Sequence, residues 1–110
     1  MKPDHAAIVA QTHAANAILR MLGRPPCEFE LREVLVADIK PSQSGEDYEN
    51  ASSRELARKT AKGQPSDRKQ DNWPIAVDEV GTIIDGNHRH AAAMLNGRKV
   101  VWALVTKGNS

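Results

Sequence analysis

The apolar run from Val100 to Val105 is the feature that most constrains the fold of this chain. All of its residues are hydrophobic, and the β-branched valines among them favour a strand. A strand that faces water on one side alternates polar and apolar residues, whereas a continuous apolar strand is covered on both faces. We therefore predict that this segment lies at the centre of a sheet.

A strand, a turn, a second strand and a helix precede this run. The segments 74–77 and 82–84 are short and apolar, and the turn 78–81 between them ends in glycine, which predicts a hairpin. Residues 89–95 are rich in alanine and are followed by Asn96-Gly97, which predicts a helix and its end. The C-terminal third therefore predicts a small sheet with one helix packed on it.

The N-terminal segment predicts a helix from Asp4 to Leu22, followed by a strand. Asp4 can cap the start of the helix and Gly23 can end it. After a break, the alternation of polar and apolar residues from Glu28 to Arg32 is typical of a half-buried strand, which Val34–Val36 continues. The apolar residues that fall near one side of the helix are Ile8, Ala15, Ile18, Leu19 and Leu22.

A polar stretch from Pro41 to Trp73 is expected to lie on the surface, with one helix inside it. Ser52 and Glu55 form a capping-box pattern at the start of that helix, and Gly63 is its expected end. Its weak inner face consists of Leu56, Ala57 and Ala61.

Basic residues outnumber acidic ones between Arg54 and Lys69. The two acidic residues are Glu55 and Asp67, and the six basic ones are Arg54, Arg58, Lys59, Lys62, Arg68 and Lys69. One interpretation is a solvated helix and loop. The other is a surface that faces phosphate or nucleic acid, on which the contacts would come from Arg54, Arg58, Lys59 and Lys62.

Length and composition exclude several classes of protein. A chain of 110 residues has room for a single core, so we expect one domain over residues 1–110. The 15 basic and 14 acidic residues give a formal charge of +1, so any contact with nucleic acid must come from a local patch. A single cysteine excludes a disulfide framework, and no apolar run is long enough to span a membrane. These features predict a cytoplasmic protein without a membrane partner.

The residues between the predicted strand 82–84 and the following helix are the candidates for a functional site. The first N–H groups of a helix have no internal partners and lie at the positive end of its dipole, so they can bind an anion. Gly86 allows close approach to the backbone, and His88 and Arg89 can donate to phosphate oxygens. In the alternative interpretation, Asp85 or Asn87 caps the helix and Arg89 lies in solvent.

Part of the sequence resembles the ParB/sulfiredoxin superfamily. The matching residues are Pro-Ile-Ala-Val at 74–77 and Gly-Thr-Ile-Ile-Asp-Gly-Asn-His-Arg-His-Ala-Ala-Ala at 81–93. The upstream segment 37–43 is similar to the early strand-to-loop segment of that superfamily. The resemblance covers residues 34–105 and leaves residues 1–24 as an N-terminal helical extension. It implies an α+β fold with a small mixed sheet and flanking helices.

The resemblance also implies a function, because this superfamily binds nucleotide phosphates at the glycine turn. Its members include CTP-hydrolysing partition proteins, an ATP-using sulfinic acid reductase, an ADP-dependent serine kinase and reported nucleases. It implies that CTP, ATP or ADP is bound, with Mg²⁺ as a companion of the phosphates. The phosphate ligands would be Gly86, Asn87, His88 and Arg89, with Lys40, Ser42 and Gln43 in the facing loop. The catalytic candidates are Asp85 and His88, and the candidate metal ligands are Glu46, Asp47 and Asp85.

Differences from the superfamily patterns reduce the number of these activities that we expect for this sequence. Asn87 stands where sulfiredoxins have their reactive cysteine, and an amide cannot act as a thiolate, so sulfinic acid reduction is not expected. The Glu-Arg-Arg motif of partition proteins and the arginine they carry after the Lys40-Pro41 region are both absent. In the sequence up to Ser110 we do not expect a helix-turn-helix motif that recognises DNA.

Three functions therefore remain from the sequence, with the oligomeric state left open. The leading one is a nucleotide-binding domain that hydrolyses or transfers a phosphoryl group. The alternatives are a nuclease that uses the same anion site and a binding module for nucleic acid or protein. His88 and His90 are two apart on a helix and point in different directions, which argues against a shared metal site. Trp102 is expected in the core, and Trp73 is expected to pack at the strand entrance or to stack on a base.

Overall fold

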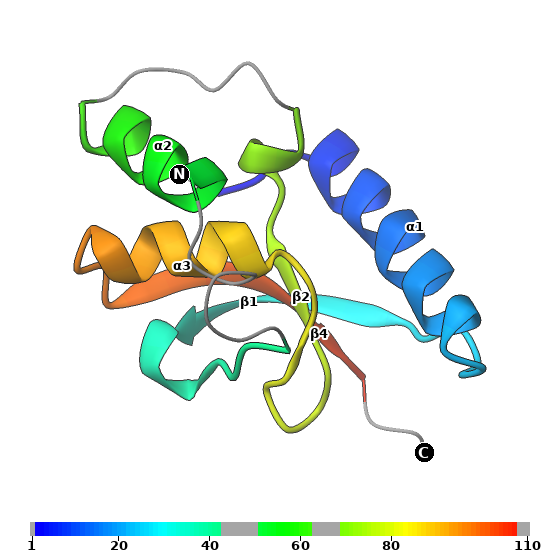
Figure 1. The fold of residues 1–110 in the computed structure, drawn as a ribbon. Coiled ribbons are helices and arrows are strands. Elements are labelled where there is room, and N and C mark those ends of the chain that lie inside the picture. The colour runs from blue at the N-terminus through cyan, green and yellow to red at the C-terminus, as the bar shows by residue number, and fades with distance from the viewer. Residues whose placement is uncertain (1, 43–50, 63–68, 108–110) are drawn as a thin grey trace.

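The computed structural model describes residues 2–42, 51–62 and 69–107. In these residues, three helices and four strands form one body, with α3 lying on the sheet and α2 on the outer side of α3 (Figure 1). None of the described helices is long and apolar enough to cross a bilayer. The α-helices are α1 (His5–Met21), α2 (Ala51–Ala61) and α3 (Asn87–Leu95), and the strands are β1 (Phe29–Leu35), β2 (Ile75–Val77), β3 (Ile83–Asp85) and β4 (Val100–Thr106). Two short 3-10 helices, η1 (Val36–Asp38) and η3 (Lys69–Asn72), lie between them.

The four strands form one mixed sheet in the order β1-β4-β2-β3. Strand β4 pairs antiparallel with β1 and parallel with β2, and β2 and β3 form the predicted antiparallel hairpin. The prediction of a central strand at residues 100–105 is therefore confirmed, and Ala103 and Leu104 are fully buried there. The mixed sheet with flanking helices also confirms the α+β class.

Small side chains let α3 lie close to both of its neighbours. Ala93 belongs to the main core with residues of β2 and β4, while Ala92 packs with Leu56 and Ala57 of α2. Bulky residues at these positions would separate the layers, because interiors are close-packed. The alanine-rich run that predicted a helix therefore also determines how closely α2, α3 and the sheet stack.

Helix α1 confirms the predicted cap and corrects part of the predicted face. The Asp4 carboxylate accepts the Ala7 N–H at 2.8 Å, as expected of a capping residue. The fully buried positions are Gln11, Ala15 and Leu19, and the helix packs on β3 and β2. Leu22, which the apolar pattern placed on the inner face, is 66% exposed because it lies beyond the last helical turn.

Helix α2 begins at Ala51, so Ser52 lies inside its first turn and is not the predicted cap. Leu56 and Ala57 are buried as predicted, but Ala61 is exposed at the end of the helix. The expected stop at Gly63 lies outside the described residues.

Gly81 is required where the hairpin turn meets the loop after β1. Its φ is +87°, and a Cβ there would lie 2.6 Å from the carbonyl oxygen of Asp38. We predict that Gly81→Ala lowers the free energy of unfolding by about 2 kcal/mol or more, because it adds a clash to the cost of a left-handed alanine. Urea denaturation measures this loss.

Gly97→Ala is the matched control for that experiment. Gly97 also has a positive φ, of +65°, but a Cβ there would meet nothing within 4 Å. The control is expected to lose only about 1 kcal/mol, which is the backbone cost alone. Equal losses in the two variants would show that the approach of Asp38 to Gly81 is not limiting.

Candidate functional site

Among the described residues, no side chain caps the start of α3. Gly86 occupies the capping position with φ +110°, and its carbonyl accepts the His90 N–H at 3.0 Å. The alternative in which Asp85 or Asn87 caps the helix is therefore wrong. A Cβ at Gly86 would lie 3.1 Å from the Arg89 guanidinium, so a residue without a side chain is favoured here. The first turn of α3 thus keeps the polarity that can attract an anion.

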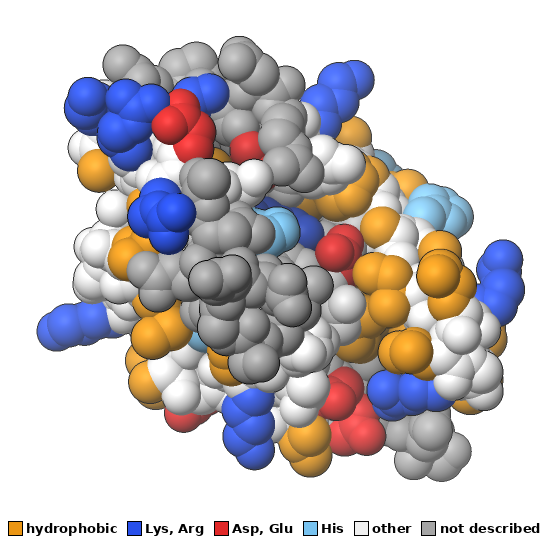
Figure 2. All heavy atoms as spheres, in the orientation of Figure 1, with side chains coloured by type: hydrophobic (Ala, Val, Ile, Leu, Met, Phe, Trp, Pro, Cys, Tyr) orange, Lys and Arg blue, Asp and Glu red, His pale blue; other side chains and the backbone are white. Residues whose placement is uncertain are grey.

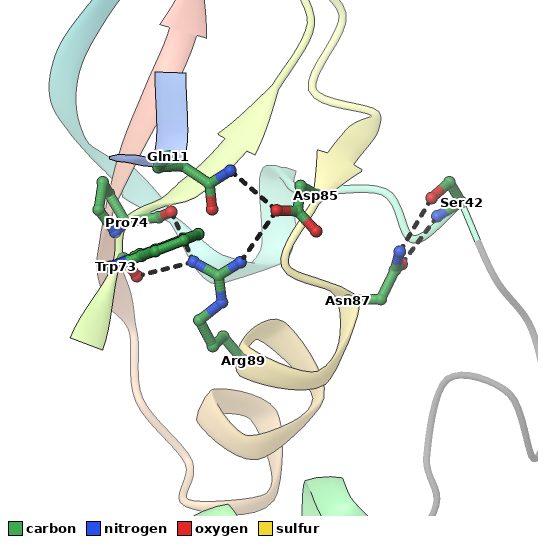
Figure 3. A network of polar contacts seen from close by, with 7 residues as sticks. All are labelled: Gln11, Ser42, Trp73, Pro74, Asp85, Asn87 and Arg89. Carbon is green, nitrogen blue, oxygen red and sulfur yellow. Dashed lines mark hydrogen bonds and ion pairs between the residues drawn. The ribbon is translucent and has the colours of Figure 1, made fainter. Parts of the chain in front are cut away.

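The guanidinium of Arg89 points into the protein. Its Nη1 donates to the carbonyl oxygens of Trp73 at 3.0 Å and Pro74 at 2.8 Å, and its Nη2 lies 3.6 Å from Asp85 Oδ2 (Figure 3). The side chain is only 10% exposed, so the alternative that places Arg89 in solvent is also wrong. Direct contact between Arg89 and a phosphate stays a prediction. Its observed contacts join α3, the end of β3 and the segment before β2.

Asp85 is held by two groups on the same oxygen. Gln11 Nε2 donates to Asp85 Oδ2 at 2.9 Å, and this oxygen also faces Arg89 (Figure 3). Gln11 is fully buried, and its Oε1 has no hydrogen-bond partner among the described residues. The sequence analysis missed Gln11, although it lies four residues before Ala15 and so falls on the buried stripe of α1.

The predicted facing loop does reach the glycine turn. Asn87 Oδ1 accepts the Ser42 N–H at 3.1 Å, and Asn87 Nδ2 donates to Ser42 Oγ at 3.0 Å. The Lys40 N–H donates to Gly81 O at 2.8 Å, and the Lys40 carbonyl accepts the Ile83 N–H at 2.9 Å, which fixes this loop along β3. The fold thus brings Lys40 and Ser42 to the residues around Gly86. Gln43 lies outside the described residues.

The two histidines of α3 make separate contacts. His88 Nδ1 lies 3.1 Å from Ser53 Oγ, and Ser53 is fully buried in α2. His90 is buried, and its Nε2 lies 3.0 Å from the Val36 carbonyl oxygen, so the two rings do point in different directions, as predicted. Sequence reasoning missed Ser53, because nothing in the pattern of α2 shows which residue of α3 it meets.

Asp85 is the described member of the predicted metal set, since Glu46 and Asp47 lie outside the described residues. The contacts of Asp85 use Oδ2, which leaves Oδ1 without a partner within the described part of the chain. Mg²⁺ commonly takes one or two carboxylate oxygens and completes its shell with phosphate and water. One carboxylate oxygen fits that pattern, whereas no cluster of three ligating side chains occurs in the described residues.

The basic residues of α2 gather on one outer surface (Figure 2). Arg58 pairs with Glu55 at 2.6 Å, and Lys59 lies 4.0 Å from the same carboxylate. The hydrogen bond from Arg58 lowers the pKa of Glu55, so this carboxylate stays ionised and offsets part of the positive charge. Arg54 and Lys62 are exposed and unpaired with the acidic groups that the structure describes. Arg68 lies outside the described residues, and Lys69 lies in η3.

Arg89→Ala tests how much the guanidinium contributes to the stability of the fold. The change leaves the Trp73 and Pro74 carbonyls without this donor and Asp85 without its cation, so we expect a loss of about 1.5–3 kcal/mol in the free energy of unfolding. Urea denaturation measures it. Arg98→Ala is the control, because Arg98 is exposed, and it should change the stability by less than about 0.5 kcal/mol. An Arg89→Ala protein as stable as the control would contradict the structural role.

Ser53→Ala tests whether α2 orients the ring of His88. Removing the hydroxyl should change the tautomer populations of His88, which long-range ¹H–¹⁵N NMR measures. His90 is the internal control, because a carbonyl only accepts and therefore requires the proton on Nε2. The His90 tautomer should not change. Unchanged spectra for both rings would contradict an orienting role of Ser53.

Solved structures match this fold, while no protein-family model and no curated protein matches the sequence. A Pnob8-like ParB-N domain is similar over 74% of this chain, with a TM-score of 0.51 and 21% identity. This chain spans 31% of that protein's length. Sulfiredoxin from Arabidopsis thaliana is similar over 72% of this chain and 86% of its own, with a TM-score of 0.49 and 18% identity. The match to the ParB-N domain shows that this protein has an α+β fold of that kind, as its sequence motif predicted.

Proposed function

We propose that this domain binds a nucleotide through its phosphates at the start of α3 and hydrolyses or transfers a phosphoryl group there. The observation that carries the proposal is the uncapped first turn of α3 at Gly86, with the Lys40–Ser42 loop facing it through Asn87. Backbone N–H groups at a helix start favour phosphate oxygens by both hydrogen bonding and the helix dipole. The Asp-Gly-Asn-His-Arg motif supports the same ligand class by resemblance.

The side chains around this turn would share the binding of the phosphates. Lys40 is exposed, and its backbone is fixed beside β3, so its ammonium would be free to extend toward a bound anion. His88 is held through Nδ1, which leaves Nε2 to meet an oxygen. Ser42 and Asn87 would form one wall of the site. Charge neutralisation and positioning are the main requirements of phosphoryl transfer, and these groups can supply both.

Asp85 and Arg89 have a supporting role in this proposal. Their mutual contact, and the bonds of Arg89 to Trp73 and Pro74, hold the glycine turn in place. Asp85 Oδ1 and His88 are the proposed catalytic groups, and Asp85 would be a ligand of Mg²⁺. The cation would neutralise phosphate charge when bound. Direct contact of Arg89 with phosphate would require it to release part of this network.

Nucleotide titrations of single variants test the binding site. ATP, CTP and ADP are titrated with and without Mg²⁺ by calorimetry into wild type, Lys40→Gln and His88→Gln. At least one nucleotide should bind the wild type, and each variant should bind about tenfold more weakly, because each loses a charge-assisted contact. Both side chains lie outside the buried core, so the variants should keep the wild-type melting temperature.

Lys99→Gln and His13→Gln are the matched controls for that titration. Both positions are exposed and lie away from the start of α3, so each control should bind like wild type. If no nucleotide binds, or if the controls weaken binding as much as Lys40→Gln and His88→Gln, the proposed site is wrong.

The unpaired basic residues of α2 favour nucleic acid as a second candidate partner, for a nuclease or for a binding module. Arg54 and Lys62 of α2 are exposed, while Glu55 partly neutralises Arg58. Backbone contacts release counterions, so binding to single- or double-stranded DNA should weaken steeply as salt rises. Replacing both Arg54 and Lys62 by Gln should make the slope of log K against log salt concentration shallower by about two, because about two phosphate contacts are lost. Binding that is absent at low salt would exclude this candidate.

A further inference from the structure

A cleft of about 550 Å³ lies beside α3. The start of α1, helices α2 and α3, the segment before β2 and the beginning of β4 all contribute to its walls. None of Lys40, Ser42, Gly86, Asn87 and His88 lines it. Its volume is within the range of pockets that hold small organic ligands. The cleft is therefore separate from the proposed phosphate site.

Both tryptophans of the chain line this cleft. Trp73 and Trp102 are each only partly buried, and the buried residues Ile75 and Val101 lie among the other lining residues. The expectation that Trp102 belongs to the core is therefore wrong. Only four residues of the chain are aromatic, so the presence of two indole rings at one cleft is a strong compositional bias. Indole faces offer a large apolar contact area to a flat ring.

One cationic group at the cleft, Arg98, remains available to a ligand. The Arg98 side chain is exposed and makes no hydrogen bond or ion pair within the described residues. Lys2 Nζ lies over the Trp102 ring, 5.8 Å from its centre, and makes a cation–π contact there. A guanidinium offers a planar, two-pronged donor to carboxylate, sulfonate or phosphate groups.

The acidic groups at the cleft are already engaged. The Asp4 carboxylate accepts the Ala7 N–H at the start of α1, where the helix dipole also favours its negative charge. Asp71 has a contact of its own. The Arg89 guanidinium reaches the cleft wall but is bonded to backbone carbonyls. The guanidinium of Arg98 can therefore pair with an anionic group on a ligand.

We propose that this cleft is a second binding site, which takes a small planar aromatic anion. The ring of the ligand would lie against Trp73 and Trp102, and its charged group would be held by Arg98, with Lys2 nearby. The site is independent of the proposed nucleotide function, because the two share none of their binding side chains.

The two indole N–H signals of the protein report directly on this site in ¹H–¹⁵N NMR spectra. The probes are 2-naphthoate and its neutral analogue 2-naphthamide, which have the same ring. Naphthoate should shift both indole signals along one saturable curve, and naphthamide should bind about fivefold more weakly because it lacks the ion pair. Arg98→Gln should weaken naphthoate binding by about the same factor and leave naphthamide binding unchanged.

Lys99→Gln is the matched control, because Lys99 is the adjacent exposed cation and does not line the cleft. It should leave the binding of both probes unchanged. Indole signals that do not shift, equal affinities for the two probes, or equal effects of Arg98→Gln and Lys99→Gln would each overturn the proposal. ATP in the same sample should not displace naphthoate, and displacement would show that the two sites are one.

Discussion

The contacts of one buried guanidinium hold this small domain together. Arg89 extends from α3 to the carbonyl oxygens of Trp73 and Pro74, where the chain enters β2, and it faces Asp85 at the end of β3. Gln11 then connects Asp85 to α1. A chain of 110 residues has a limited apolar core, so a cation that satisfies several oxygens at once has a large share in fixing how the helices meet the sheet.

The same network explains why the start of α3 is uncapped. An aspartate just before a helix is a good capping residue, and Asp85 is in that position in the sequence. In the structure its Oδ2 accepts from Gln11 and faces Arg89, while Gly86 serves as the cap residue with no side chain to offer. The carboxylate is thus held away from the N–H groups that a phosphate would need. The interaction that stabilises the fold also keeps the Asp85 carboxylate from capping the candidate anion site.

Helix α3 contributes to two surfaces with different chemistry. At its start, Ser53 and Ser42 contact His88 and Asn87 beside the glycine turn. The cleft beside α3 is lined by the two tryptophans and Arg98, together with the buried residues Ile75 and Val101. The alanines of α3 are buried among α2 and the sheet, so the helix can carry both surfaces while it remains closely packed.

Local patterns in the sequence were sufficient for most of the secondary structure. The continuous apolar run predicted the interior strand β4, the glycine-ended turn predicted the β2–β3 hairpin, and Asp4 predicted the start of α1. The order of strand, glycine turn and alanine-rich helix also predicted the ParB/sulfiredoxin-like fold. Such features are encoded by neighbouring residues, so they can be read without knowledge of distant contacts.

Only the tertiary structure decided what the polar side chains contact. Whether Asp85 caps α3 or pairs with Arg89 depends on Gln11, which is 74 residues away in the sequence. The position of Trp102 at a cleft, and the meeting of Ser53 with His88, likewise depend on how the helices pack. The sequence by itself determined the elements and the polarity of the helix start, because backbone geometry and hydrophobic period are local. The partners of each charged or aromatic group were decided by folding, because they come from segments far apart in the chain.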